Sequence, residues 1–426
     1  MLDLRFVRDN VEAVQKNCRH RNVSVDVSRV VELYDARNAM LQEIERLRQR
    51  RNQNAKQMKG KMEQEERAKL IEEGRELKES IASLETRLGE TEAELDTTAK
   101  RIPNMSHPDA PVGKEESDNV EIRRVGTPPR FEFDAKDHVE LAESLGIIDF
   151  DTAAKVSGAK YYYLRGKGVY LELALVRYAM DIAQKHGFFP HITPDVARTD
   201  IIEGIGFNPR GAESNIYGIE DTDTCLIGTA EITLGAYHAD SILDTTALPI
   251  KMAGLSHCFR REAGAAGQYS RGLYRVHQFT KVELFAFVLP ATSEAMLDEI
   301  LALEEEVYSG LGIAYRIVDT CTGDLGGPAY RKFDIEAWMP GRGDGGSYGE
   351  VTSASNCTDY QARRLSVRYR DTDGTVAPLH MLNGTAVAVS RAIVSILENY
   401  QQSDGSVRMP EVLVPYLGFE AIGADP

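Results

Sequence analysis

The sequence predicts an α+β protein in which a long antiparallel helical hairpin precedes a globular domain built on an antiparallel sheet. Three observations favour this fold class. Residues 28–100 lack proline and carry apolar residues at alternating steps of three and four, which is typical of coiled-coil helices. A proline-rich, polar stretch follows over residues 103–130. Beyond it, strand-like windows follow one another directly, as they do in an antiparallel sheet.

Composition places the chain among globular proteins with more than one domain. Its 426 residues are enough to bury a substantial core. Acidic residues outnumber basic ones by 66 to 50, and the net charge of −16 excludes a generally basic nucleic-acid binder while allowing a local basic patch. No uninterrupted apolar run is long enough for a transmembrane helix, so we expect no membrane partner.

The N-terminus and the cysteines predict a cytoplasmic protein. The start carries Asp3, Asp9 and Glu12 and has neither an apolar core nor a small-residue cleavage site, which argues against a secretion signal or an organelle presequence. The five cysteines lie far apart without a C-x-x-C pair, so we expect neither disulfides nor a zinc site. This expectation includes Cys258 and His257, two potential ligands that are adjacent in the sequence.

Within residues 28–100, two apolar runs are separated by a polar, glycine-containing break at 60–66. The first run is Leu33, Met40, Ile44, Leu47, Ala55 and Met58, and the second is Leu70, Leu77, Ile81, Leu84, Leu88 and Leu95. We expect two helices of about 30 residues to fold back on each other as a hairpin roughly 45–50 Å long, within an N-terminal domain over residues 1–105. One long parallel coiled coil between two chains is the alternative; the central break favours the hairpin.

The segment 46–62, near the expected tip of the hairpin, holds seven basic residues and no acidic one. On a protein of opposite net charge, such a segment is suited to contact with phosphates through counterion release. A solvated helix face is the alternative explanation, and the two remain equally open on charge alone. The residues that we would assign to a polyanion are Arg46, Arg50, Arg51, Lys56 and Lys59.

The globular domain is expected over residues 106–426. Its helical windows are 171–186, 293–311 and 386–401, and its clearest strand-like windows are 251–259 and 276–288. Because several strands are consecutive, the pattern favours an α+β domain over a doubly wound sheet.

The segment 258–285 is predicted to form two strands joined by a glycine-rich connection at 263–272. The two-residue period of a strand puts Arg260 and Glu262 on one face of the first strand. On the second strand the same period groups His277, Phe279, Lys281 and Glu283. Such a face is costly to bury without partners, and glycines let backbone approach a phosphate. A surface hairpin with ion pairs is the alternative.

Residues 382–400 are predicted to form a helix opened by Gly384 and Thr385. Arg391 lies in its otherwise apolar stripe. A buried guanidinium needs an anion, and an acidic side chain or a bound phosphate would serve equally well.

Taken in order, these segments resemble the class II aminoacyl-tRNA synthetases. FRRE at 259–262 resembles their motif 2, the arginine-bearing segment 384–391 their motif 3, and Pro194 in HITPDVAR their motif 1. Four further segments narrow the resemblance to seryl-tRNA synthetases. These are Thr229-Ala230-Glu231, RVHQFTKVE at 275–283, SNCTDYQARR at 355–364 and the start MLDLRFVRDN. The resemblance covers essentially the whole chain, and the ordered set is far more specific than any single motif.

The resemblance implies a serine–tRNA ligase that activates L-serine with ATP to seryl-adenylate and transfers it to tRNA(Ser), and also to selenocysteine tRNA where that tRNA is present. It implies a class II catalytic domain at 106–426, a tRNA-binding N-terminal domain, a homodimer, and Mg²⁺ bound together with ATP. The bases at the hairpin tip would then contact tRNA.

The resemblance also implies roles for individual residues. Arg260, Glu283 and Arg391 would be catalytic, and serine would contact Thr229, Ala230, Glu231, Arg260, Glu283 and Thr385. ATP would contact Arg260, Arg261, Glu262, Arg275, Val276, Phe279, Glu350, Val351, Thr352, Ser353 and Arg391, with Mg²⁺ at Glu350 and Ser353. Arg260 suits the charge that grows on the α-phosphate, Arg391 the γ-phosphate, and Phe279 the adenine ring.

Two features depart from the family pattern, and two rival functions remain. Ala386 and Ser390 stand in motif 3 where glycine is common, and Gly228 stands where proline is frequent. One rival is an enzyme that passes seryl-adenylate to a carrier protein, which would not need a basic arm. The other is a non-catalytic RNA-binding paralogue, which would not need Arg260, Glu283 and Arg391. An antibiotic-resistant duplicate of the ligase would keep every residue named here.

Overall fold

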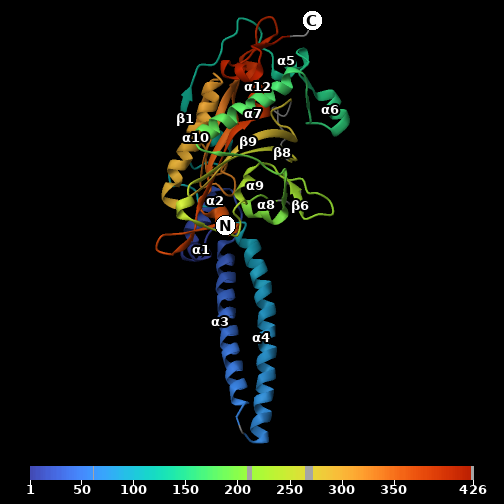
Figure 1. Cartoon of the computed structure of the whole chain (residues 1–426). Helices are drawn as coiled ribbons and strands as arrows, with labels where there is room; N and C mark the ends of the chain where they lie inside the picture. The colour runs from blue at the N-terminus through green and yellow to red at the C-terminus, as the bar shows by residue number, and fades with distance from the viewer. Residues whose placement is uncertain (61, 209–213, 264–271, 424–426) are drawn as a thin grey trace. The chain divides into compact units, whose positions relative to one another are not determined.

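The computed structural model describes residues 1–60, 62–208, 214–263 and 272–423. The chain divides into two compact units, Met1–Met105 and Ser106–Pro426 (Figure 1). The predicted connection at 263–272 lies almost wholly outside the described residues. In the described part of the chain, every helix is too short or too polar to cross a membrane.

The first unit consists of two short helices followed by two long antiparallel ones (Figure 1). Its helices are α1 (Leu4–Asp9), α2 (Val11–His20), α3 (Val27–Gln57) and α4 (Gln64–Ala99). The side chain of Asp26 accepts the backbone N–H of Arg29 and so caps the start of α3. Helices α3 and α4 pack against each other within one chain, which confirms the hairpin and excludes the parallel coil.

The apolar seam of the hairpin is confirmed along most of its length and fails near the tip. The expected residues that are buried are Leu33, Ile44, Leu77, Ile81 and Leu95. Near the tip, Ala55 and Met58 are exposed and Asn54 is buried in their place. The Nδ2 atom of Asn54 donates to the carbonyl of Leu70 and to Oε2 of Glu73, both at 3.0 Å. A buried amide that needs these partners fixes the register of the two helices.

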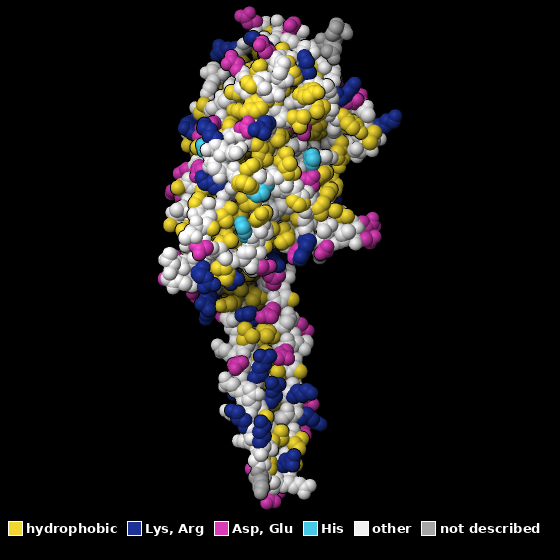
Figure 2. All heavy atoms as spheres, in the orientation of Figure 1, with side chains coloured by type: hydrophobic (Ala, Val, Ile, Leu, Met, Phe, Trp, Pro, Cys, Tyr) yellow, Lys and Arg dark blue, Asp and Glu magenta, His cyan; other side chains and the backbone are white. Residues whose placement is uncertain are grey.

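Acidic residues of the hairpin neutralise part of the basic segment. Arg46 lies 2.7 Å from Glu43, and Arg50 lies 2.6 Å from Glu73, measured between guanidinium nitrogen and carboxylate oxygen. Within the described residues, the bases without an acidic partner at ion-pair distance include Arg51, Lys56 and Lys59. Lys and Arg side chains gather along the lower part of the hairpin, interspersed with acids (Figure 2). In the described part of the hairpin, fewer basic side chains are therefore available to a polyanion than the sequence predicts.

The second unit is built on an eight-stranded sheet with the order β1-β10-β11-β12-β15-β9-β8-β4. The strands are β1 (Val120–Val125), β4 (Phe189–Ile192), β8 (Ile250–Phe259), β9 (Gln278–Val288), β10 (Tyr315–Asp319), β11 (Arg331–Met339), β12 (Ser347–Asn356) and β15 (His380–Ala388). Neighbouring strands are antiparallel except β4 and β8, which are parallel. The predicted α+β class with a mostly antiparallel sheet is confirmed.

Helices cover both faces of this sheet (Figure 1). The larger hydrophobic core contains residues of α7 (Lys167–Lys185), α10 (Ser293–Gly310) and α12 (Val389–Asn399), and the smaller one contains residues of α8 (Thr199–Ile205), α9 (Glu231–Gly235) and α11 (Tyr360–Arg364). Strand β9 serves both, because Leu284 and Ala286 join the larger core while Phe285 and Phe287 join the smaller one. Burial on both faces explains why the second half of this strand, residues 284–288, is a continuous apolar run.

Shorter elements complete the second unit. The remaining helices are α5 (His138–Ser144), α6 (Phe150–Ser157) and α13 (Val414–Leu417), with 3-10 turns at Glu116–Asp118, Thr245–Ala247, Pro290–Thr292 and Glu411–Leu413. The small sheets pair β2 (Ile148–Asp149) with β3 (Tyr163–Leu164), β5 (Val196–Arg198) with β6 (Thr224–Leu226), and β16 (Val407–Arg408) with β17 (Ala421–Ile422). A three-stranded sheet joins β7 (Ile242–Asp244), β13 (Arg368–Arg370) and β14 (Val376–Pro378).

Two expectations about secondary structure are wrong. The stretch 103–130 is not only a linker, because its residues Val120–Val125 form β1 and pair with β10. The segment predicted as a helix opened by Gly384 and Thr385 is the end of strand β15, and α12 begins only at Val389. Gly384 is needed for close packing, since a Cβ atom there would lie 2.3 Å from Ile300 Cγ2. The helices predicted at 171–186 and 293–311 are confirmed as α7 and α10.

Candidate active site

A cavity of about 160 Å³ opens where strands β12 and β15 separate. These two strands are paired only at Ala354–Gly384, Ser355–Asn383 and Asn356–Leu382, and then diverge. Most of the predicted site residues line the cavity: Thr229, Glu231, Arg260, Glu262, Arg275, Val276, Phe279, Glu283, Glu350, Val351, Thr352, Ser353, Thr385 and Arg391. A larger hollow of about 830 Å³ shares Glu231, Ser353 and Asn383 with it.

Two register shifts explain how the strands present these side chains. In β12 the pairing skips Val351, and in β15 it skips Ala386. An extra residue in one strand reverses the alternation of faces beyond it. Glu350 and Ser353, which are three residues apart, therefore reach the same cavity. Period-2 reasoning alone would have placed them on opposite faces.

Arg260 and Phe279 face each other across the ends of β8 and β9. The guanidinium carbon of Arg260 lies 5.2 Å from the ring centroid of Phe279, and Nε donates to the carbonyl of Gly228 at 3.2 Å. Stacking on the ring and the hydrogen bond hold the guanidinium in place. Arg261, predicted to contact ATP, does not line the cavity: it is exposed, because the residue after Arg260 points the other way.

Glu262 and Arg275 form an ion pair at the wall of the cavity. Nη1 of Arg275 lies 3.3 Å from Oε2 of Glu262, and the side chain of Glu262 is 11 % exposed. The φ angle of Glu262 is 48°, in the left-handed region that non-glycine residues rarely adopt. This strained backbone turns the carboxylate toward Arg275 at the point where the strand ends.

Arg391, which the sequence places in an apolar stripe, has an acidic side chain as its partner. Its Nη1 donates to the backbone carbonyl of Glu350 at 2.9 Å and to Oε1 of Glu350 at 3.1 Å. Its guanidinium carbon lies 4.7 Å from the ring centroid of Tyr274, whose hydroxyl donates to the same carbonyl at 3.0 Å. Burial raises the pKa of Glu350, but the cations Arg391, Lys332 and Arg260 outweigh it and hold this pKa below its ordinary value.

Glu231 lies at the other end of the cavity among neutral donors. Gln361 Nε2 and Asn383 Nδ2 donate to its Oε1 at 2.7 and 3.0 Å. Burial, together with the charge of Glu283, raises the pKa of Glu231 to about 7. Ala230, predicted as a serine contact, is fully buried in the smaller hydrophobic core and does not line the cavity.

Glu283 is buried beside a lysine. Lys281 and Glu283 form an ion pair in which the side chains are 7 % and 2 % exposed. Burial raises the pKa of Glu283 above its ordinary value, although Lys281 and Arg260 act to lower it. Thr229 and Thr385 line the same end of the cavity. The cavity thus holds both signs of charge, with each of Glu262, Glu283 and Glu350 paired to a cation.

The sequence reasoning missed Tyr274, Lys281 and Asn383 as site residues, and all three line the cavity. A signal for two of them was present. Lys281 shares the strand face of Phe279 and Glu283, and Asn383 precedes Thr385 by two residues, on the same face of its strand. Tyr274 lies outside regular structure, so no periodicity could have placed it.

The donor set at Glu350 and Ser353 fits a hard divalent cation. A carboxylate kept ionised by neighbouring cations and a hydroxyl on the same wall are the oxygen ligands that Mg²⁺ prefers. These two side chains would hold the ion together with oxygens of the phosphates and of water. In the part of the chain that the structure describes, no group of three or more His, Cys, Asp or Glu side chains is placed to hold a metal.

Comparison with known families identifies this arrangement. The model of the tRNA synthetase class II core domain (G, H, P, S and T) matches residues 217–400, so the fold and the cavity define a class II tRNA synthetase. The model of the seryl-tRNA synthetase N-terminal domain matches residues 1–106. The chain belongs to the seryl-tRNA synthetase family.

Individual relatives extend over the whole chain. The serine–tRNA ligases of Treponema denticola and Rubrobacter xylanophilus are each 57% identical to it over 423 residues, which is 99% of this chain and 100% and 99% of those proteins. The crystal structure of seryl-tRNA synthetase from Pyrococcus horikoshii complexed with ATP is 42% identical, with a TM-score of 0.92 and full coverage of both chains. That of the cytoplasmic enzyme from Naegleria fowleri with AMP is 34% identical, with a TM-score of 0.87 and coverage of 100% and 99%.

Proposed function

We propose that this protein is a serine–tRNA ligase that forms seryl-adenylate from L-serine and ATP and then transfers the seryl group to tRNA(Ser), and to selenocysteine tRNA where that tRNA is present. The observation that carries the proposal is the cavity itself. It brings together Arg260, Arg275 and Arg391, which suit phosphates, with the buried carboxylates Glu231 and Glu283, which suit an ammonium group, and this combination matches ATP beside an amino acid. The second unit is the catalytic domain and the first is the tRNA-binding domain.

In the first step, a carboxylate oxygen of serine attacks the α-phosphorus of ATP, and pyrophosphate leaves. Negative charge grows on the α-phosphoryl oxygens, and Arg260, held by Phe279 and Gly228, stabilises it. Arg391 binds the γ-phosphate in exchange for its contact with Glu350. Positioning and charge carry the rate, and no side chain acts as a nucleophile.

Adenine binds against Phe279. The free face of its ring stacks on the base, while Arg260 lies on the other side. Glu262 accepts from the exocyclic amine, and Arg275 adds a phosphate contact once it exchanges its ion pair with Glu262 for the nucleotide. Glu350 and Ser353 would hold the Mg²⁺ of the MgATP substrate, which would supply charge neutralisation to the phosphates.

Serine is selected by its ammonium and its hydroxyl. Glu231 and Glu283 provide negative charge for the ammonium, and the hydroxyls of Thr229 and Thr385 provide hydrogen-bonding groups nearby. Alanine lacks the hydroxyl and leaves buried polar groups unpaired. In a site of this kind, that loses far more binding free energy than the removal of a methylene group. In the second step, a hydroxyl of the terminal tRNA ribose attacks the seryl carbonyl and AMP leaves.

The hairpin is the proposed contact for tRNA. Arg51, Lys56 and Lys59 offer positive charge without an acidic partner in the described structure, while Arg46 and Arg50 must exchange an ion pair for a phosphate. RNA duplexes are bound largely through shape and phosphates, which suits a rigid, basic helical arm. A ligase that transfers serine to a carrier protein would have no use for these bases.

A homodimer in the cytoplasm is also proposed. Strand β4 is an edge of the main sheet and exposes large apolar side chains, including Phe189 at 69 % and Ile192 at 83 %. Pro194, which resembles motif 1, follows it directly. Hydrophobic side chains cover a broad part of the face in Figure 2, and such patches mark surfaces that bind another chain.

Pyrophosphate exchange into ATP tests the proposal. We expect exchange that depends on serine, is weak with threonine and alanine, and is accompanied by charging of tRNA(Ser). Exchange without any tRNA charging, but with transfer to a carrier protein, would favour the first rival. A folded protein without serine-dependent exchange would favour the non-catalytic paralogue.

A further inference from the structure

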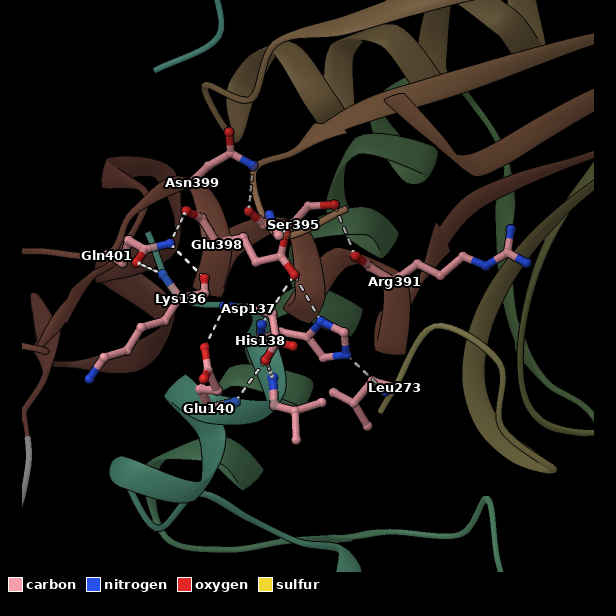
Figure 3. Close-up of polar contacts among 12 residues, drawn as sticks. Lys136, Asp137, His138, Glu140, Leu273, Arg391, Ser395, Glu398, Asn399 and Gln401 are labelled. Atoms are coloured by element: carbon pink, nitrogen blue, oxygen red, sulfur yellow. Dashed lines mark hydrogen bonds and ion pairs between the residues drawn. The ribbon is translucent and has the colours of Figure 1, made fainter. Parts of the chain in front are cut away.

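A buried histidine and glutamate join helices α5 and α12 beside the cavity (Figure 3). His138 begins α5 and is 8 % exposed, and Glu398 lies near the end of α12 and is 2 % exposed. Oε1 of Glu398 lies 2.8 Å from Nδ1 of His138 and accepts the backbone N–H of His138 at 3.1 Å. Oε2 accepts the N–H of Gly341 at 2.8 Å. Both oxygens of the buried carboxylate are therefore satisfied.

The backbone of Leu273 determines the tautomer of this histidine. Its N–H lies 3.2 Å from Nε2 of His138. A backbone N–H can only donate, so Nε2 must accept, and the ring proton lies on Nδ1 and points to Glu398. The neutral imidazole thus relays two successive hydrogen bonds, from Leu273 to His138 and from His138 to Glu398.

Gly272 allows the chain to come this close. Its φ angle is +71°, and a Cβ atom there would lie only 2.1 Å from Nε2 of His138. Any other residue would be strained in this conformation and would displace the imidazole. The chain is therefore adapted at Gly272 to the contact that Leu273 makes.

Leu273 in turn positions the next residue, Tyr274. The ring of Tyr274 lies under the guanidinium group of Arg391, and the Tyr274 hydroxyl donates to the backbone carbonyl of Glu350. Arg391 lies seven residues before Glu398 on α12, which is two helical turns. Glu398 of α12 holds His138, and His138 holds Leu273. The next residue, Tyr274, contacts Arg391, so this chain of contacts begins and ends on α12.

We propose that the His138–Glu398 pair is a positioning device for the ATP site. By fixing Leu273, it keeps the Tyr274 ring against Arg391 and so sets the direction in which the guanidinium group meets the triphosphate. The inference rests on the proposed function, in which Arg391 binds ATP. His138 does not line the cavity and acts only through Leu273 and Tyr274, so it is a positioning residue.

Substitution of His138 in the full chain tests this device. His138→Phe keeps a ring but removes both the acceptor for Leu273 and the donor to Glu398. We expect the KM for ATP in serine-dependent exchange to rise about tenfold, while the KM for serine changes less than twofold, because only the ATP contact is displaced. His138→Gln, whose side-chain oxygen can accept from Leu273, should recover most of the loss.

Two further variants separate positioning from general stability. His186→Phe is the matched control, because His186 also pairs with a glutamate, Glu306, at 2.7 Å, and neither residue lines the cavity. It should leave the KM for ATP unchanged. Tyr274→Leu removes the ring from Arg391 and should reproduce the effect of His138→Phe, and the double variant should be no worse than either single one.

The outcomes are distinct. A folded His138→Phe variant with an unchanged KM for ATP, or with equal rises for ATP and serine, overturns the inference. If His138→Phe does not fold, His138→Gln and Tyr274→Leu decide the question by the same readout. Absence of exchange in the unmodified protein overturns the proposed function instead. Calorimetric titration of ATP then tests the device separately, and equal Kd values for the unmodified protein and His138→Phe overturn it.

Discussion

The helical hairpin and the catalytic cavity both hold ion pairs, but under opposite conditions. In the hairpin, Arg29 and Glu94 pair at 2.7 Å with side chains 46% and 51% exposed. In the cavity, Lys281 and Glu283 pair with almost no exposure. Water screens an exposed pair, so its loss changes stability little, whereas removal of one partner from a buried pair leaves an uncompensated charge. The charged side chains of the hairpin can thus exchange their partners for a ligand, whereas the buried ion pair of the cavity holds its side chains in fixed positions.

The largest effect is expected in the cavity. Arg260→Ala should lower kcat of serine-dependent pyrophosphate exchange by about 10²–10³-fold, because it removes one fixed cation from the developing phosphoryl charge. Steady-state exchange at saturating ATP and serine measures this. Arg29→Gln in the hairpin is the control and should keep full exchange. A loss smaller than tenfold for Arg260→Ala would contradict the role given to this arginine.

The next effect belongs to the hairpin. Replacing Arg51, Lys56 and Lys59 together with alanine should weaken tRNA binding by on the order of 10²-fold at low salt and flatten its salt dependence, since up to three phosphate contacts are lost. Filter binding at several salt concentrations measures both. The paired bases Arg46 and Arg50 give the comparison.

For Arg46→Ala with Arg50→Ala we expect a smaller loss of tRNA affinity, because these two arginines must first leave Glu43 and Glu73. Serine-dependent pyrophosphate exchange in the absence of tRNA should be unchanged in both sets of variants. Equal losses for the paired and unpaired bases would mean that the ion pairs of the hairpin do not control its charge.

In the cavity, unlike the hairpin, ligand binding should depend on pH through Glu231. With the pKa of Glu231 near 7, its ionised fraction rises about tenfold between pH 6 and pH 8, and the KM for serine should fall by a similar factor, because the serine ammonium needs the ionised carboxylate. Glu231→Gln should bind serine weakly and without this slope. A KM for serine that is flat from pH 6 to 8 in the unmodified protein would contradict the assignment.

The same group has a calculable effect on stability. The unfolded chain releases the Glu231 proton near pH 4.5, whereas the folded chain keeps it until about pH 7. The folded state binds more protons in this window, so the contribution of Glu231 to the free energy of unfolding is lost as the pH rises through it. Chemical unfolding at pH 5 and pH 8, compared with Glu231→Gln, measures the loss.

The smallest effect is local to the hairpin. Asn54→Ala should cost about 1 kcal/mol, because it removes a buried amide with two partners near the tip. Hydrogen exchange should quicken in α3 and α4 near residues 50–75 and stay unchanged in the eight-stranded sheet. Faster exchange throughout the sheet would show that the two units do not unfold separately.

Much of the fold was predictable because one-dimensional patterns carry it. The period of Leu77, Ile81 and Leu95 requires a helix with one buried stripe. A polar break does separate the two helices, although α4 begins at Gln64, inside the break predicted at 60–66. The hairpin charge was overestimated, because partners such as Glu73 and Glu85 lie on the other helix and their pairing depends on register. Strand β1 was missed because its alternating apolar residues are only Val120 and Ile122, both exposed, within a stretch rich in proline and polar residues.

In the site, residues on regular strands were easier to place than those outside them. The face shared by Phe279, Lys281 and Glu283 follows from the two-residue period. Ala230 and Arg261 were assigned by resemblance, and their neighbours rather than they themselves line the cavity. His138 and Glu398 are 260 residues apart, and no local pattern of the sequence indicates that they meet.

The skipped residues in β12 and β15 bear on how chain length can vary here. Val351 has no partner of its own in the ladder, so its deletion would leave Glu350 opposite Glu336 and Thr352 opposite Ile335. Deletion of Thr352 instead would put Val351 opposite Ile335, and Glu350 would again stay opposite Glu336 and keep its face. A homologous sequence with a one-residue gap at 351 or 352 would therefore keep the carboxylate on the cavity side, so the bulge marks the place in β12 where chain length can vary without a change of register.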